Sequence, residues 1–147
     1  MSVRSAWLHA RSPLLSCQAH FFSSKVLYKS IMRGEIGMEL NSYKQDKFFI
    51  VKASGRMDAI SAPEFEKSCL EWIQQGESTL VVDLEGLQYM SSAGLRSILV
   101  VGKKLKSVGG SLSFSSLTPN VAHVFSISSF GSMFPVYDSL EKALGNS

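Results

Sequence analysis

A short apolar run in the middle of the chain constrains the fold more than any other segment. Residues 80–84 read LVVDL, without the polar alternation of a half-exposed strand. A run of this kind is typical of a central strand that is buried on both faces of a sheet. Such a strand needs other elements packed on both of its faces, so the run predicts an α/β domain.

Strand-like and helix-like segments alternate on both sides of this run. Aromatic, β-branched or alternating stretches predict further strands at 39–43, 48–51, 111–115 and 134–136. Apolar periodicity and end signals predict helices at about 61–75, 92–107, 118–125 and 138–144. This order predicts a single α/β domain with a mixed, largely parallel sheet of four to five strands and about four helices.

The first two predicted helices each carry an apolar stripe. The stripes comprise Phe65, Cys69, Trp72 and Ile73 in the first helix, and Leu95, Ile98, Leu99, Gly102 and Leu105 in the second. Ser61 and Glu64 have the spacing of a capping box, in which each side chain bonds the other residue's backbone N–H. We therefore expect the first helix to begin near Ser61 and to bury Phe65 and Trp72 against the strand at 80–84.

Residues 1–37 differ in composition from the remainder of the chain. They carry a formal charge of +4, whereas the whole chain carries +3, so residues 38–147 are close to neutral. This distribution argues against a nucleic-acid partner for the domain. Arg11 and Pro13 interrupt the apolar core that a secretory signal needs, and residues 14–17 resemble a lipoprotein cleavage box only faintly. The Ser- and Arg-rich composition fits a mitochondrial transit peptide better.

A further interpretation is that residues 1–37 are not made in the cell. Residues 33–35 can be encoded AGG-GGA-GAA, a purine-rich ribosome-binding sequence just upstream of Met38. We therefore expect the folded domain to span residues 38–147. Residues 1–37 are then either a disordered leader or translated upstream DNA that precedes the true start.

Several kinds of site are excluded by what the sequence lacks. No run approaches 18 consecutive apolar residues, so no membrane-spanning helix is predicted. Cys17 and Cys69 are too few for a disulfide framework or a four-cysteine zinc site. The domain has one histidine, His123, and no glycine-rich phosphate loop or nucleophile elbow. We therefore predict no enzymatic activity, catalytic residue, metal or cofactor.

Residues 83–96 read DLEGLQYMSSAGLR, which follows the apolar run and leads into the second predicted helix. This segment resembles the signature loop of STAS domains in bacterial anti-sigma factor antagonists, where Asp-Ser-Ser/Ala-Gly-Leu opens a helix. Residues 55–58 (GRMD) resemble the family's Gly-x-Ile/Leu-Asp turn. Residues 134–139 (FPVYDS) resemble its C-terminal strand-to-helix step. The three motifs occur in the family's order and imply a STAS fold.

The resemblance implies a function and a set of site residues. The family's phosphorylated serine corresponds to Ser92, and the Asp that precedes it is replaced here by Ser91, which is a competing acceptor. Asp58 corresponds to a position that contacts the kinase partner, and Gly94 and Arg96 complete the expected partner-binding set. The implied protein is a cytoplasmic regulator of transcription. It binds an anti-sigma factor with serine kinase activity, releases a sigma factor, and is dephosphorylated by a PP2C-type phosphatase.

The chemistry at Ser92 supports a switch independently of the resemblance. A serine at a helix N-terminus can cap free backbone N–H groups, and a phosphate there would meet the same donors. Phosphorylation adds a charge of about −1.5 to −2. Arg96 follows one helical turn later, where it opposes the helix dipole unless a phosphate gives it a partner.

Two other classes of function remain. The loss of the family Asp at Ser91 is consistent with a STAS scaffold or a transporter-associated regulatory module that is not phosphorylated at Ser92. An enzyme that uses Ser92 as a nucleophile would need a base nearby, and the sequence offers only His123 on a different helix. We therefore expect a binding module, either switched by phosphorylation of Ser92 or not phosphorylated there, rather than an enzyme.

Overall fold

The structure is a computed structural model that describes residues 37–145. The expectations for residues 1–36 lie outside this range. The elements in chain order are β1 Met38–Gln45, β2 Phe48–Met57, α2 Ala62–Gln74, β3 Thr79–Met90, α3 Ser92–Ser107, β4 Ser111–Ser115, α4 Pro119–Ile127, α5 Phe130–Met133, β5 Val136–Tyr137 and α6 Leu140–Gly145. All of the predicted strands and helices are present.

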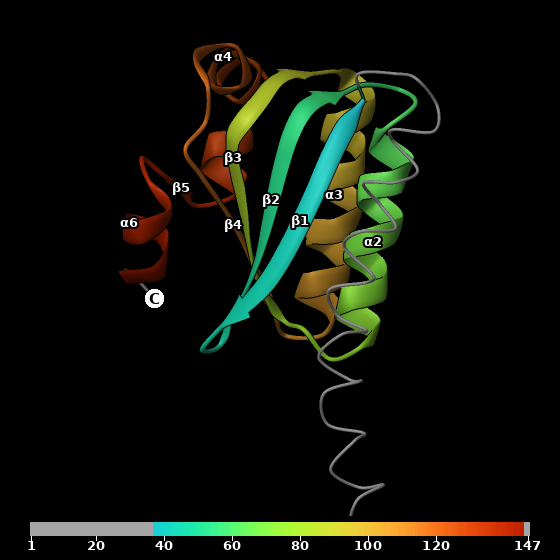
Figure 1. Ribbon diagram of the computed structural model, residues 1–147, viewed down its shortest axis with the longest axis vertical. Coiled ribbons are helices and arrows are strands. Elements are labelled where there is room, and N and C mark those ends of the chain that lie inside the picture. The colour runs from blue at the N-terminus through green and yellow to red at the C-terminus, as the bar shows by residue number, and fades with distance from the viewer. Residues whose placement is uncertain (1–36, 146–147) are drawn as a thin grey trace, which may run out of the picture. The chain divides into compact units, whose positions relative to one another are not determined.

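The strands form one sheet in the order β1-β2-β3-β4-β5. The β1–β2 pair is antiparallel, and the other three pairs are parallel. Helices α2 and α3 lie side by side against one face of the sheet (Figure 1). The predicted α/β fold with a mixed, largely parallel sheet is confirmed. The described residues form five helices rather than about four, because α5, of four residues, was not anticipated.

The apolar run of residues 80–84 lies in the central strand, as predicted. Each of its residues is at most 3% exposed. On one face, Val81 belongs to a cluster with Phe48 and Ile50 on β2 and with Ala143 on α6. The other face packs against α2 and α3. Burial on both sides explains why this strand lacks the alternation of a half-exposed one.

Helix α2 buries the predicted stripe but does not begin with the predicted capping box. Phe65 and Trp72 are buried, and the Trp72 ring lies 5.0 Å from that of Phe49 on β2. Ser61 already has helical backbone angles and makes no side-chain capping bond. Its hydroxyl donates instead to the carbonyl of Arg56, at 2.7 Å. The capping-box prediction was therefore wrong, because this serine bonds back to the end of β2.

Helix α3 is rotated relative to the predicted stripe. Its buried residues are Gly94, Ser97, Ile98, Val101 and Leu105, whereas Leu95 and Leu99 are half-buried. Gly94 sets this orientation at the start of the helix. A Cβ there would lie 3.0 Å from the side chains of Met57 and Met90, so these side chains would have to move for any larger residue.

Strand β3 is longer than predicted and reaches Met90. It continues because it pairs with β2 as far as Met57, through two irregularities in the register. Gly86 permits this pairing, since a Cβ there would lie 2.6 Å from the Cβ of Ser54. The expected loop after residue 84 is therefore the second half of a strand. Asp83 lies within this strand and is buried.

Candidate functional site

The carboxyl ends of β2 and β3 lie next to each other and define the candidate site. The Ser91 N–H donates to the carbonyl of Met57, at 2.9 Å, and so ties the start of α3 to the end of β2. The turn of residues 58–61 therefore lies beside the first turn of α3, at the upper end of the sheet in Figure 1. This parallel pairing brings together two of the sequence motifs, residues 55–58 and 83–96.

The two serines at the start of α3 occupy different positions. Ser91 is the N-cap residue, with φ −89° and ψ 173°, and its Oγ accepts from the Gly94 N–H, at 3.4 Å. Ser92 is the first residue of the helix and is exposed. The Ser92 hydroxyl makes no hydrogen bond within residues 37–145. The prediction that Ser92 caps the helix was therefore wrong by one residue, because Ser91 is the last extended residue.

Gly94 lies on the buried side of the first turn of α3. It is buried against Met57 and Met90, and its missing side chain lets α3 approach the ends of the two strands. Its structural contribution is thus to hold Ser91 and Ser92 close to the turn after β2. Direct contact between Gly94 and a partner stays a prediction.

Asp58 organises the turn between β2 and α2. Its Oδ1 accepts from the Ile60 and Ser61 N–H groups, both at 3.0 Å, and from the Ser61 hydroxyl, at 3.1 Å. The bond from the Ser61 N–H is the main cause that lowers the pKa of Asp58 below its ordinary value. Partial burial opposes this shift, and the charge of Arg56 contributes least to it. The Asp58 carboxylate therefore stabilises the turn in which it lies.

Arg56 and Tyr89 form a contact that the sequence did not reveal. The guanidinium carbon lies 4.3 Å from the centroid of the tyrosine ring, which is the geometry of a cation–π interaction. Both residues are exposed, on neighbouring positions of β2 and β3. The pairing depends on the irregular register between these strands, so no local signal could have identified it.

Arg96 borders a shallow hollow between α2 and α3. The hollow has a volume of about 250 Å³ and is lined by Ala62, Pro63, Glu66, Ala93, Arg96, Ser97 and Val100. The Ser97 hydroxyl donates to Glu66 Oε2, at 3.1 Å, and joins the two helices. Arg96 is exposed and makes no ion pair within the described part of the chain. It lies one helical turn after Ser92, as predicted.

Residues 37–145 hold no cluster of three His, Cys, Asp or Glu side chains that could bind a metal ion. His123 is exposed on α4. Asp83 is buried near Lys52, with 3.8 Å between Oδ2 and Nζ, and burial raises the pKa of the Cys69 thiol. No helix in this range is long and apolar enough to cross a membrane.

Comparison with known proteins identifies the family. The model of the STAS domain matches residues 39–143, and the chain belongs to this family. A relative from Bordetella bronchiseptica, named "Putative anti-sigma factor antagonist BtrV", is 41% identical over 106 residues, which cover 72% of this chain and 91% of the relative. An anti-sigma-B factor antagonist from Staphylococcus aureus is 26% identical over 106 residues, covering 72% of this chain and 98% of the relative.

Solved structures are similar as well. A crystal structure of an anti-sigma factor antagonist from Mycobacterium paratuberculosis matches with a TM-score of 0.68 and 23% identity, over 74% of this chain and 92% of that one. The unphosphorylated form of the anti-sigma factor antagonist SpoIIAA matches with a TM-score of 0.63 and 21% identity, over 71% and 92%. At these identities, the similarity establishes the fold alone. The predicted STAS fold is confirmed.

Proposed function

We propose that this chain is an anti-sigma factor antagonist whose binding is switched by phosphorylation of Ser92. In the unmodified state, the face around Ser92 binds an anti-sigma factor that is also a serine kinase, and a sigma factor is released. The kinase then phosphorylates Ser92, the complex dissociates, and a PP2C-type phosphatase restores the free hydroxyl. This cycle belongs in the cytoplasm and requires no catalytic residue in the chain itself.

The position of Ser92 is the observation that carries this proposal. Its hydroxyl is exposed at the first turn of α3, whereas the neighbouring Ser91 hydroxyl already accepts from the Gly94 N–H. A kinase can therefore reach Ser92 without breaking the helix cap. Ser91 stays the alternative acceptor, since it replaces the Asp found at this position in the family.

A phosphate on Ser92 acts on the partner more than on the fold. It would lie at the positive end of α3, near backbone N–H groups and one turn from the unpaired guanidinium of Arg96. The domain can therefore accept the new charge. A partner whose surface fitted a neutral hydroxyl must bury or repel a dianion, which costs several kcal/mol. We propose that Asp58, Ser91, Ser92, Gly94 and Arg96 form or support this docking face.

A second candidate function follows from Ser91. Without the family's carboxylate beside the acceptor, kinase recognition loses one charged determinant. The chain would then be a STAS scaffold or a transporter-associated regulatory module that binds its partner without phosphorylation at Ser92. The two candidates share the docking face and differ only in its regulation.

Phosphopeptide mass spectrometry separates the two candidates. The full chain is incubated with ATP and the anti-sigma factor kinase of the same organism, and peptides that cover residues 83–103 are analysed. We expect one phosphate, on Ser92, and none in a parallel sample of Ser92→Ala. Phosphate on Ser91 would move the switch by one residue. An unmodified peptide after exposure to an active kinase would favour the scaffold.

A further inference from the structure

The turn between β2 and α2 displays a large apolar side chain. Ile60 is 58% exposed, although its neighbours Met57 and Ala62 are buried. Exposure alone decides nothing, because single apolar side chains on protein surfaces are common. Ile127, on the last turn of α4, is even more exposed, at 71%. What distinguishes Ile60 is how firmly its backbone is held.

Hydrogen bonds among residues 56–62 hold the backbone of the turn that carries Ile60. Asp58 Oδ1 accepts from the N–H groups of Ile60 and Ser61, and the Asp58 N–H donates to Ser61 Oγ, at 3.0 Å. Ser61 is buried, and its hydroxyl donates to the carbonyl of Arg56. The Ala62 N–H donates to the carbonyl of Asp58, at 2.9 Å. Both ends of the turn are thereby fixed to β2 and α2.

A fixed turn matters for binding because ordering a loop opposes association. A side chain whose backbone is already held loses less conformational entropy when a partner covers it. Strong contributors at interfaces are large side chains that fill a pocket of the partner. Ile60 has both properties: a large apolar surface that is free in this domain and a backbone that does not need to be ordered.

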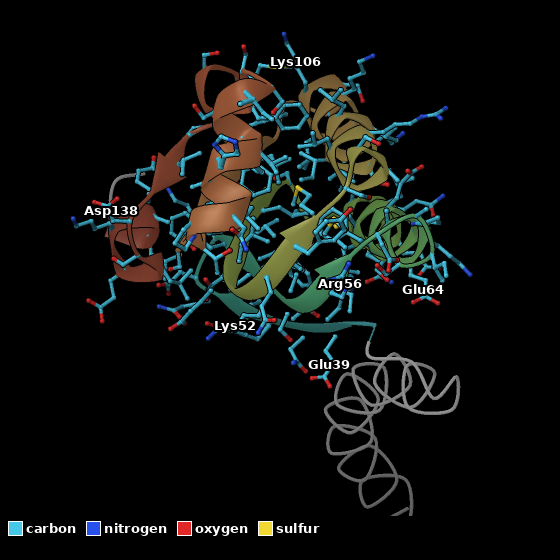
Figure 2. All side chains as sticks on the ribbon, turned by 90° about the horizontal axis from the view of Figure 1, so that it is seen from above. Glu39, Lys52, Arg56, Glu64, Lys106 and Asp138 are labelled. Atoms are coloured by element: carbon cyan, nitrogen blue, oxygen red, sulfur yellow. The ribbon has the colours of Figure 1, made fainter. Side chains whose placement is uncertain are left out.

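The turn also lies next to the phosphorylation site. Ser91 bonds to Met57, one residue before Asp58. Ala62 and Ala93, which follow Ile60 and Ser92 closely in sequence, line the same hollow between α2 and α3. In the view from above, Arg56 and Glu64, which flank the turn, are seen on the same side of the domain (Figure 2). The turn that carries Ile60 and the first turn of α3 are therefore neighbours at the carboxyl ends of β2 and β3.

We propose that Ile60 is the apolar anchor of the docking face and that Asp58 positions it. This inference rests on the proposed function and deepens it: the anti-sigma factor presents an apolar pocket beside the surface that receives Ser92. Asp58 Oδ1 is occupied by the donors of its own turn. Its Oδ2 makes no hydrogen bond within residues 37–145, so the variants below separate a role of Asp58 through Ile60 from direct contact of its charge with the partner.

Affinity measurements with purified anti-sigma factor kinase of the same organism test the anchor. Isothermal titration compares the full-length parent with Ile60→Ala, Ile60→Val and Ile127→Ala. We expect Ile60→Ala to weaken binding at least about tenfold, as for a residue that fills a pocket. Ile60→Val, which keeps a β-branched apolar side chain but removes one methylene, should weaken binding by about fourfold, clearly less than Ile60→Ala does. Ile127→Ala is the matched control and should bind as the parent does.

Two Asp58 variants test the positioning role. Asp58→Asn keeps an acceptor oxygen but removes the charge, whereas Asp58→Ala removes both. We expect Asp58→Asn to stay within about threefold of the parent and Asp58→Ala to weaken binding at least about tenfold. In the double variant with Ile60→Ala, the Asp58→Ala change should add little, because the side chain that it positions is already gone.

The outcomes separate this inference from the proposed function. If the parent binds and Ser92→Asp does not, but Ile60→Ala binds as tightly as the parent, the anchor role is wrong. If Asp58→Asn loses as much affinity as Asp58→Ala, the carboxylate contacts the partner directly and the positioning role is wrong. A parent chain that binds no anti-sigma factor kinase would overturn the proposed function itself, and this inference with it. Melting temperatures close to the parent's for the Ile60 variants would show that folding is not the cause.

Discussion

At the scale of single residues, the two adjacent serines at the start of α3 differ in their hydrogen bonding. Ser91 caps the helix with its Oγ, and Ser92 leaves its hydroxyl exposed. The sequence identified this pair but placed the cap on Ser92, one residue too late. The position of the cap depends on where the chain leaves its extended conformation, and the pairing of β3 with β2 determines that point.

Stability measurements distinguish the two serines. Ser91→Ala removes the cap and should lower the free energy of unfolding by about 1 kcal/mol. Ser92→Ala removes no hydrogen bond within residues 37–145 and should change it by less than about 0.5 kcal/mol. Urea denaturation of both variants provides the comparison. A larger loss for Ser92→Ala than for Ser91→Ala would reverse the assignment of the cap.

Asp58 makes stability depend on pH. Its folded pKa is lowered, chiefly by the hydrogen bond from the Ser61 N–H. A group with a depressed folded pKa contributes stability above its unfolded pKa and loses it as the pH falls through the folded value. We therefore expect the parent to lose more stability than Asp58→Asn when the pH is lowered from 5 through the region below about 4. Urea denaturation of both chains across this pH range measures the loss. Equal losses in the parent and in Asp58→Asn would contradict the lowered pKa of Asp58.

At the scale of secondary structure elements, local sequence patterns identified the central strand and the first helix. The run at residues 80–84 and the stripe that includes Phe65 and Trp72 are read from local patterns, and both are buried as predicted. The second half of β3 could not be recognised, because its pairing with β2 depends on register irregularities and on Gly86 facing Ser54. Those are contacts between residues far apart in the chain.

The buried stripe of α2 gives a direct test at this scale. Phe65 is fully buried, and Trp72 contacts Phe49 on β2. Phe65→Ala or Trp72→Ala should each lower the free energy of unfolding by about 3–5 kcal/mol through lost burial and the cavity left behind. Lys67→Ala, on the exposed side of the same helix, is the matched control and should cost less than about 0.5 kcal/mol. If Lys67→Ala cost as much as Phe65→Ala or Trp72→Ala in urea denaturation, the buried face of α2 would be misassigned.

At the scale of the whole molecule, the motifs gave a set of candidate site residues, and the fold explains why two of the motifs lie close together. Residues 55–58 and 83–96 come together because β2 and β3 are parallel neighbours, which a strand–helix–strand order predicts. Ile60 and the Arg56–Tyr89 contact escaped prediction. Their significance depends on exposure and on register, and neither is visible in the sequence.

The family model matches from residue 39, and β1 is the first described element. Met38 and Leu40 on β1 are buried. We therefore expect a chain that begins at Met38 to melt at the same temperature as the full chain. Differential scanning calorimetry on both chains measures this. A midpoint lower by several degrees in the shorter chain would show that residues 1–37 contribute to the stability of the domain.

Replacement of Ser92 by aspartate provides the decisive comparison for a charge-operated switch. An acidic residue in the first turn of a helix interacts favourably with the helix dipole, so Ser92→Asp should remain folded, with a melting temperature near that of the parent. Its affinity for the anti-sigma factor kinase should fall about a hundredfold, which corresponds to about 2.7 kcal/mol. Ser92→Ala should bind as the parent does, and so should Ser126→Asp, which adds the same charge at an exposed serine on α4. Binding of Ser92→Asp within threefold of the parent would contradict the switch.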